Sequence, residues 1–231
     1  MKKKVRFVNL QFKNKKFKKN ILKRFNNILN HGQFILGPEV EEMEKEIAKY
    51  CKRKFCLGTA SGTDALYLAV RALNIGKGDE VITSPMTWVS STNSILMNNA
   101  KPIFVDIKDD LNIDENKIEQ NMTKKTKAIL YVNYTGKVAN TKKIISIANK
   151  YKLKVIEDSA QSFGSLRFNK PSGSFGDISC FSFNPMKVLP SLGEAGAIVT
   201  NDEKIYKKIK ILRYAGTSSI ENCLYPSLNL K

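Results

Sequence analysis

The chain has 231 residues, 42% of them hydrophobic, which is enough to bury a full core, so a disordered protein is not expected. Its 39 lysines and arginines exceed its 21 acidic residues and give a net charge of +18, but the lysines are spread along the whole length and no nucleic-acid-binding signature occurs. Four cysteines without zinc spacing and a single histidine argue against a metal site.

Residues 1–30 are basic, and lysines interrupt every apolar run there. No signal-peptide core forms, and no stretch is long enough to cross a bilayer, so no membrane partner is expected. The cysteine pattern favours a reducing, cytoplasmic setting. We therefore expect a basic N-terminal arm with some helix over residues 1–30, followed by one large domain over residues 31–231.

The first predicted elements frame a turn of small residues. Gly37-Pro38 predicts the start of a helix, and residues 55–57 predict a short strand. The turn at residues 58–63 then leads into a helix over residues 64–73. A small-residue turn at a helix N-terminus presents unpaired amides that can bind phosphate, although a simple helix cap is the alternative.

Trp88, the only tryptophan, follows the predicted strand at residues 80–83 and precedes a helix that runs through Ser91. A lone tryptophan is commonly a core residue, but an aromatic ring at the C-terminal end of a strand can also stack on a flat ligand.

The rest of the chain alternates apolar strands with helical patterns. This alternation predicts an α/β fold with a mostly parallel central sheet and helices on both faces. The further strands are expected at residues 103–105, 128–132, 155–156 and 178–183, and the further helices at residues 116–121, 142–151 and 204–212.

Two of these strands end in residues that can carry chemistry. The strand at 155–156 delivers Asp158 to its C-terminal end, where open α/β sheets bind ligands. The strand at 178–183 is followed by a turn and by Lys187 in apolar company. Desolvation lowers the pKa of a lysine and allows it to attack carbonyls, so Lys187 is a candidate Schiff-base lysine. The alternative is a surface lysine beside a turn.

Five motifs occur in the order and approximate spacing of a known family. They are SGTDAL (61–66), MTWVSS (86–91), VIEDSAQSFGS (155–165), GDISCFSFNPMK (176–187) and GEAGAIVTND (193–202). Together they resemble the sugar aminotransferases of the DegT/DnrJ/EryC1/StrS group, which are enzymes of fold type I that depend on pyridoxal 5'-phosphate (PLP). The resemblance covers the chain from about residue 37 to residue 231.

The resemblance implies a role for each candidate residue. Lys187 would hold PLP as a Schiff base and move protons as acid and base, and Asp158 would keep the pyridine nitrogen protonated so that the ring accepts electrons. Trp88 would stack on the ring and Gln161 would bind its phenolic oxygen. The phosphate would be bound by the backbone of Gly62, Thr63 and Asp64, by the hydroxyl of Ser182, and by Asn229 of a neighbouring subunit.

The implied reaction moves an amino group, usually from glutamate, to a nucleotide-linked keto-deoxysugar. Some relatives carry histidine at the lysine position and catalyse dehydration, so Lys187 favours amino transfer. The partners implied are the nucleotide-sugar substrate, an amino-acid donor and a second copy of the chain in a homodimer.

The chain departs from the family at its C-terminal end. Relatives continue past the segment that matches residues 227–231 into a smaller C-terminal domain, which we expect to be missing here. Two alternatives to an active enzyme therefore stay open. The chain could be a catalytically inactive truncated remnant, or half of a split aminotransferase that needs a partner chain. A basic nucleic-acid-binding protein is a third hypothesis, suggested by the charge alone.

Overall fold

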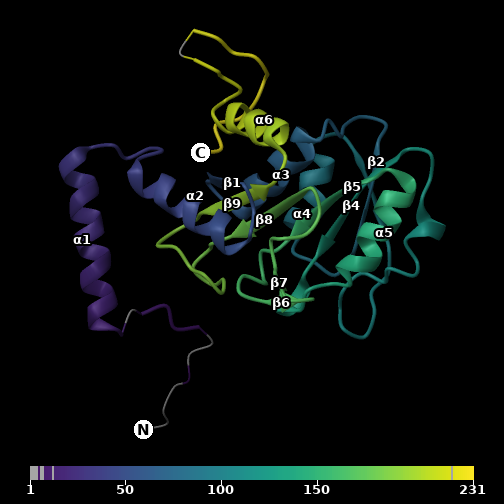
Figure 1. Cartoon of the computed structure of the whole chain (residues 1–231), viewed down its shortest axis with the longest axis horizontal. Coiled ribbons are helices and arrows are strands. Elements are labelled where there is room, and N and C mark those ends of the chain that lie inside the picture. The colour runs from purple at the N-terminus through teal and green to yellow at the C-terminus, as the bar shows by residue number, and fades with distance from the viewer. Residues whose placement is uncertain (1–4, 6–7, 12, 220) are drawn as a thin grey trace.

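The computed structural model describes residues 5, 8–11, 13–219 and 221–231. Its centre is a seven-stranded sheet in the order β1-β9-β8-β5-β4-β2-β3, in which β9 alone of the sheet's described strands runs against the others (Figure 1). The predicted mostly parallel sheet is thereby confirmed. The strands are β1 (Phe55–Thr59), β2 (Glu80–Thr83), β3 (Lys101–Phe104), β4 (Thr126–Val132), β5 (Lys154–Asp158), β8 (Ile178–Ser182) and β9 (Gly196–Thr200), and β6 (Leu166–Arg167) pairs with β7 (Lys170–Pro171) separately.

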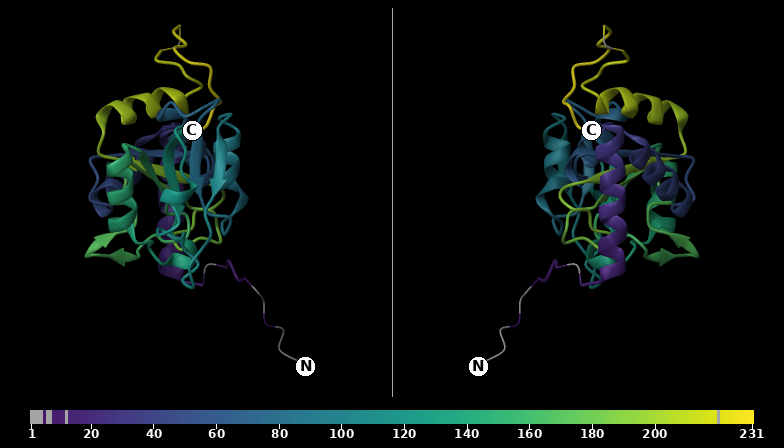
Figure 2. Two further views of the ribbon diagram at one scale, coloured as in Figure 1. Left: turned by 90° about the vertical axis from the view of Figure 1, so that its right-hand side faces the viewer. Right: turned by 90° about the vertical axis from the view of Figure 1, so that its left-hand side faces the viewer.

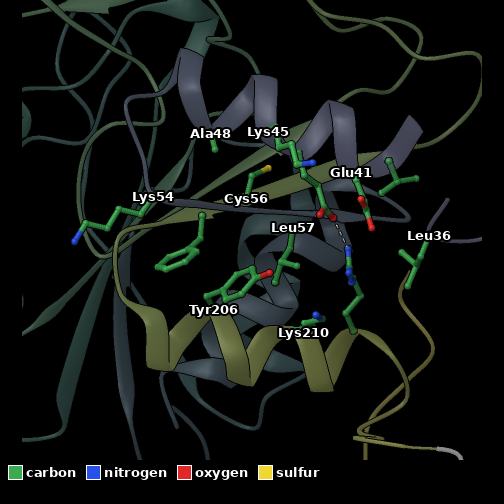
Figure 3. A pocket seen from close by; sticks show the side chains of 13 residues that line it. Leu36, Glu41, Lys45, Ala48, Lys54, Cys56, Leu57, Tyr206 and Lys210 are labelled. Atoms are coloured by element: carbon green, nitrogen blue, oxygen red, sulfur yellow. Dashed lines mark hydrogen bonds and ion pairs between the residues drawn. The ribbon is translucent and has the colours of Figure 1, made fainter. Parts of the chain in front are cut away.

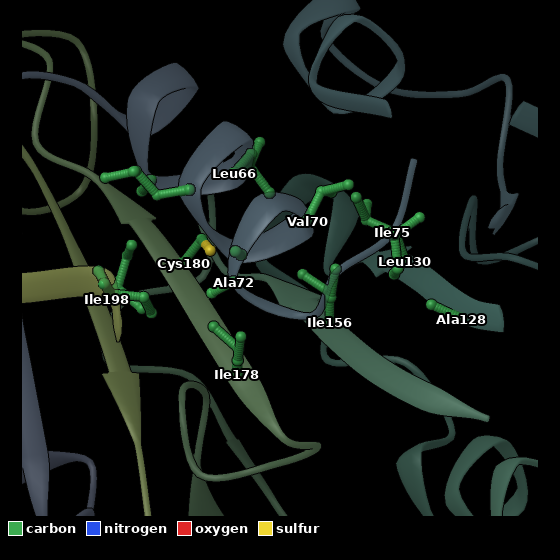
Figure 4. Packing of buried hydrophobic residues seen from close by; sticks show 14 of the residues in the cluster. Leu66, Val70, Ala72, Ile75, Ala128, Leu130, Ile156, Ile178, Cys180 and Ile198 are labelled. Carbon is green, nitrogen blue, oxygen red and sulfur yellow. The ribbon is translucent and has the colours of Figure 1, made fainter. Parts of the chain in front are cut away.

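Helices cover both faces of the sheet, as the sequence predicts. The main apolar cluster lies between the sheet and three helices, α3 (Gly62–Ala72), α4 (Val89–Leu96) and α6 (Glu203–Arg213). Figure 4 shows the part of this cluster in which side chains of α3 pack against those of the strands. Two smaller clusters on the opposite face include residues of α2 (Pro38–Tyr50) and α5 (Thr141–Tyr151).

Alternation along the strands decides which side chain enters which cluster. On β5, Val155 belongs to the cluster with α5, whereas Ile156 belongs to the cluster with α3. Successive side chains of a strand point to opposite faces, so Glu157 and Asp158 are directed to different sides of the sheet. Asp158 thereby faces the side of α3 and α4.

The first helix, α1 (Lys15–His31), runs along one side of the domain (Figures 1 and 2). The Asn14 side chain accepts a hydrogen bond from the Phe17 amide and caps its start, and none of its residues is buried. An ion pair between Arg24 and Glu42 joins α1 to α2. The expected helical content of the N-terminal segment is thus present, while the division at residue 30 stays a prediction.

The helix predicted at residues 116–121 is wrong. Only a single 3₁₀ turn, η1 (Glu119–Asn121), forms there. The Asp114 side chain accepts hydrogen bonds from the backbone and the side chain of Asn116, and the Asp114 carbonyl accepts one from the Lys117 amide. Such local bonds compete with helix formation.

The strand expected at residues 80–83 is present with those ends. Other expected elements are present with shifted ends: the strand expected at 103–105 begins at Lys101, and the helix expected at 64–73 begins at Gly62. No helix of the described residues is both long enough and apolar enough to cross a membrane.

Candidate active site

A cavity of about 350 Å³ opens where β2, β5 and β8 end and α3 begins. This is the C-terminal edge of the parallel strands, where ligands bind in open α/β sheets. Most of the residues singled out in the sequence meet here. The cavity is lined by Gly62, Thr63, Trp88, Asp158, Gln161, Ser182 and Lys187, together with residues of the loops around them.

Two of the candidate residues do not line this cavity. The Asp64 carboxylate accepts a hydrogen bond from Ser61 Oγ at 2.8 Å, on the first turn of α3. Asn229 is exposed and forms a β-bridge with Tyr214. The roles expected for these two residues stay predictions.

The start of α3 forms the anion-binding end of the cavity. Ser61 Oγ accepts from the Asp64 amide at 3.1 Å, which leaves the amides of Gly62 and Thr63 without a hydrogen bond within the described part of the chain. A Cβ on Gly62 would lie 2.6 Å from the Ser182 Cβ, so glycine allows α3 to start directly against β8. This contact brings the Ser182 hydroxyl next to free amides at the positive end of a helix dipole.

Asp158 lies buried at the end of β5. Its Oδ2 accepts a hydrogen bond from Ser91 Oγ at 2.7 Å, and its Oδ1 accepts one from the Ala160 amide at 3.1 Å. Burial raises the pKa of the Asp158 carboxyl, while these two hydrogen bonds and the charge of Lys187 act in the opposite direction. A positively charged ligand atom beside this carboxylate would therefore be favoured.

Gln161 and Trp88 lie on further parts of the cavity wall. Gln161 Oε1 accepts a hydrogen bond from the Thr135 amide at 3.1 Å, which leaves the NH₂ group of Gln161 as the donor for a ligand. Trp88 precedes the first residue of α4, and its side chain is 70% exposed. Its indole is thus available to stack on a flat ring.

Lys187 sits on a turn directly after β8. Its backbone amide donates to the Asn184 carbonyl at 2.8 Å, and its half-buried side chain lines the cavity that Asp158 also lines. A lysine amine and a buried carboxylate thus share one site. Among the described residues, no group of three histidine, cysteine, aspartate or glutamate side chains is placed to hold a metal ion.

Sequence reasoning missed several residues that line the cavity. Ser91 donates to Asp158 and shares a hydrogen bond of 2.7 Å with Thr87, and Asn184 pairs with Glu194. One sequence signal was available: Thr87 and Ser91 are four residues apart around the start of a helix, a spacing that can bring two hydroxyl groups within hydrogen-bond distance.

A second cavity, of about 420 Å³, lies between α2, β1 and α6 (Figure 3). Its buried polar contact is the ion pair between Arg213 Nη1 and Glu44 Oε1, at 2.7 Å. The lysines that line it, Lys45, Lys54 and Lys210, are all exposed. The acid in this second cavity, Glu44, is already paired with Arg213, and the lysines are exposed to solvent. The cavity in which Lys187 lies with the buried Asp158 is therefore the better candidate for catalysis.

Comparison with known proteins agrees with this geometry. The model of the DegT/DnrJ/EryC1/StrS aminotransferase family matches residues 15–225. The chain belongs to this family.

Three members of the family illustrate the similarity. The dTDP-3-amino-3,6-dideoxy-alpha-D-galactopyranose transaminase of Aneurinibacillus thermoaerophilus is 41% identical over 96% of this chain and 62% of its own. The UDP-2-acetamido-2-deoxy-3-oxo-D-glucuronate aminotransferase of Pseudomonas aeruginosa is 40% identical over 89% of this chain and 58% of its own. The crystal structure of NtdA from Bacillus subtilis with bound cofactor PMP superposes with a TM-score of 0.88 at 35% identity, covering 98% of this chain and 52% of that one.

The chain therefore spans 62% and 58% of the length of these two curated relatives. Family members depend on PLP. The residues of the cavity fit this group, since they offer free amides for a phosphate, a buried carboxylate for a protonated ring nitrogen and a lysine amine for the aldehyde. When bound, PLP supplies an electron sink next to the substrate's amine-bearing carbon.

Proposed function

We propose that the chain is the PLP-binding part of a nucleotide-sugar aminotransferase, in which Lys187 holds the cofactor as a Schiff base. The observation that carries the proposal is the presence of Lys187 and the buried Asp158 in one cavity whose far end is the free N-terminus of α3. Neither a surface lysine nor a simple helix cap accounts for this convergence.

Each residue has a task in this proposal. The amides of Gly62 and Thr63 and the hydroxyl of Ser182 bind the phosphate. Asp158 holds a proton at the ring nitrogen, Gln161 donates its NH₂ group to the phenolic oxygen, and Trp88 stacks on the ring. Lys187 Nζ would act as the acid and base that moves a proton between the substrate's amine-bearing carbon and the cofactor's aldehyde carbon, in one direction for the donor and in the reverse direction for the acceptor.

Asp64 and Asn229 need a different explanation. The Asp64 amide already donates to Ser61 Oγ, so it would contact the phosphate only by sharing its proton between two acceptors. Asn229 is exposed outside the cavity, and we propose that it reaches the phosphate bound by a second copy in a homodimer.

For the substrates, we propose an amino-acid donor, glutamate, and a keto-deoxysugar linked to a nucleoside diphosphate as acceptor. The names of the two curated relatives support this class, since they contain a dTDP-linked amino sugar and a UDP-linked oxo sugar. We further propose a cytoplasmic setting. The four cysteines are all free, as a reducing compartment would leave them.

The alternative proposal concerns turnover rather than fold. The chain spans 62% of the A. thermoaerophilus relative, and in this alternative the closure of the substrate site depends on polypeptide that corresponds to the remaining part. In that case the chain binds PLP, and amino transfer requires a partner chain or is absent.

The test begins with an absorbance spectrum of the purified chain after PLP is added, followed by borohydride reduction and peptide mapping. We expect a visible absorbance band and a reduced label on Lys187. Lys187→Ala should lose both, whereas the control Lys170→Ala, which removes an exposed lysine outside the cavity, should keep both. Absence of the label from Lys187 in the wild-type chain would refute the cofactor assignment.

Turnover is measured next, with glutamate and dTDP- or UDP-linked keto sugars. Amino transfer by the isolated chain supports the enzyme proposal and rejects the need for a partner. Transfer that starts only when the part of a relative beyond the matched region is supplied as a separate polypeptide supports the alternative.

A further inference from the structure

The loop between β8 and β9, which carries Lys187, is closed at its base. The Phe183 amide donates to the Ala195 carbonyl at 2.8 Å, and the Ser191 amide donates to the Phe183 carbonyl at 2.7 Å. These bonds join the two ends of the loop but do not involve Lys187. The position of the lysine within the loop depends on a second set of contacts.

Asn184 is the centre of that second set, because each of its polar groups has a partner. Its carbonyl accepts from the Lys187 amide at 2.8 Å, and its side-chain Oδ1 accepts from the Met186 amide at 3.0 Å. Its side-chain Nδ2 donates to Glu194 Oε1, and its own amide donates to Ser182 Oγ at 3.4 Å. One residue thus connects the turn of the lysine, the serine beside the start of α3 and the far side of the loop.

The orientation of the Asn184 amide group follows from these bonds. Met186 N–H can only donate, so it requires the oxygen of the amide on its side. The NH₂ group must then point to Glu194, whose carboxylate can only accept. Glu194 therefore holds the amide group in the one orientation that also supports the turn. Both Asn184 and Glu194 line the cavity that contains Lys187.

We propose that Asn184 and Glu194 are positioning residues, which fix the turn that bears Lys187 and hold its amine where the cofactor aldehyde binds. The inference rests on the proposed function for the identity of the aldehyde. It adds a role for two residues that do not themselves contact the reacting atoms.

Two isosteric substitutions together exchange the donor and the acceptor of the hydrogen bond between Asn184 and Glu194. In Asn184→Asp, the carboxylate still accepts from Met186 but faces Glu194 with like charge, so the contact is lost. In Glu194→Gln, the side-chain oxygen still accepts from Asn184, so the contact is kept. In the double variant Asn184→Asp/Glu194→Gln, the glutamine NH₂ donates to the aspartate, and the net charge equals that of the wild type.

The experiment compares these three variants with the wild type in two measurements. Hydrogen exchange of residues 184–195 in the cofactor-free chain reports on the turn, and the rate of borohydride-trapped PLP labelling of Lys187 reports on its amine. We expect Asn184→Asp to speed exchange and to slow labelling by about fivefold each, the effect of losing one hydrogen bond. Glu194→Gln should stay close to the wild type, and the double variant should recover most of both losses.

If aspartate at position 184 disturbs the loop for a reason unrelated to Glu194, then adding Glu194→Gln will restore neither exchange nor labelling. A double variant that behaves like Asn184→Asp would therefore overturn the proposal. Exchange and labelling that stay at wild-type values in Asn184→Asp would overturn it as well. If the wild-type chain takes no PLP label, the proposed function fails, and hydrogen exchange alone then decides whether the pair fixes the turn.

Discussion

Glu157 and Asp158 are consecutive residues on β5, yet their carboxylates enter opposite faces of the sheet with different surroundings. Glu157 is fully buried, and both of its oxygens accept hydrogen bonds from protein donors. Asp158 receives two donors and also faces the cavity. Glu157 therefore stabilises the fold, whereas the Asp158 carboxylate is available to a ligand. The donors to Glu157 are Asn133 Nδ2, Ser172 Oγ, Ser179 Oγ and the amides of Gly173 and Phe175.

Glu157→Gln should therefore destabilise the chain strongly. Glutamine places an NH₂ donor where the structure already has donors, so at least one buried donor loses its acceptor. We expect a loss of about 3 kcal/mol in the free energy of unfolding, measured by urea denaturation. The control Glu46→Gln, at an exposed position of α2, should change stability by less than about 0.5 kcal/mol. Equal stability of the two variants would contradict the anchoring role.

The neighbouring acid should behave in the opposite way. Burial raises the pKa of the Asp158 carboxyl above its ordinary value. A carboxyl whose pKa is higher in the folded than in the unfolded chain favours folding while it is protonated, and this contribution is lost as the pH rises through the folded pKa. Asp158→Asn, which carries no charge, should therefore raise the Tm of the cofactor-free chain at pH 7.

The difference in Tm between Asp158→Asn and the wild type should shrink as the pH falls through the raised pKa of the folded carboxyl towards its ordinary value of about 3.9, below which the carboxyl is protonated in both the folded and the unfolded chain. Thermal unfolding followed by circular dichroism across this range measures it. A variant that is less stable than the wild type at pH 7 would show that the hydrogen bonds from Ser91 and Ala160 outweigh the cost of burial.

Ser91→Ala tests how the chain stabilises the charged form of Asp158. Ser91 Oγ donates to Asp158 at 2.7 Å, and a hydrogen bond to a charged group contributes more than one between neutral groups. Its loss should weaken PLP binding by about tenfold in an absorbance titration. Thr92→Ala removes the neighbouring hydroxyl of α4, which does not line the cavity, and should bind PLP like the wild type.

How far the sequence could predict this site depends on the kind of interaction. Asp158 ends an apolar strand and Lys187 follows one, and the ends of parallel strands meet at one edge of a sheet, so local patterns made both of them candidates. The family resemblance was needed to favour Lys187 over a surface lysine and to add Ser182. The pairing of Asn184 with Glu194 depends on the path of a loop, and the bond from Ser91 to Asp158 joins residues 67 positions apart. No periodic pattern encodes such contacts.

The same distinction explains the fold. Six strands of the central sheet are largely buried on both faces, so their apolar runs identify them, whereas the edge strand β3 is exposed or half-buried. The segment at residues 116–121 is predicted to be helical, but the Asp114 side chain accepts a hydrogen bond from the backbone amide of Asn116 and the chain forms a turn instead. Side-chain to backbone bonds of this kind cannot be inferred from hydrophobic periodicity.

Gly62→Ala tests the close contact of α3 with β8. A Cβ at Gly62 would lie 2.6 Å from the Ser182 Cβ and 3.1 Å from the Ser182 Cα, so either the helix start or the end of β8 must move. We expect a loss of about 2 kcal/mol in the free energy of unfolding, typical of overpacking. The affinity for PLP should also fall, because the free amides and the Ser182 hydroxyl no longer converge.

Gly76→Ala is the matched control, since its Cβ would make only an ordinary contact of 3.5 Å with the Asn98 carbonyl oxygen. Urea denaturation and a PLP titration of both variants separate the two effects. Wild-type affinity in Gly62→Ala would show that the start of α3 does not bind the phosphate.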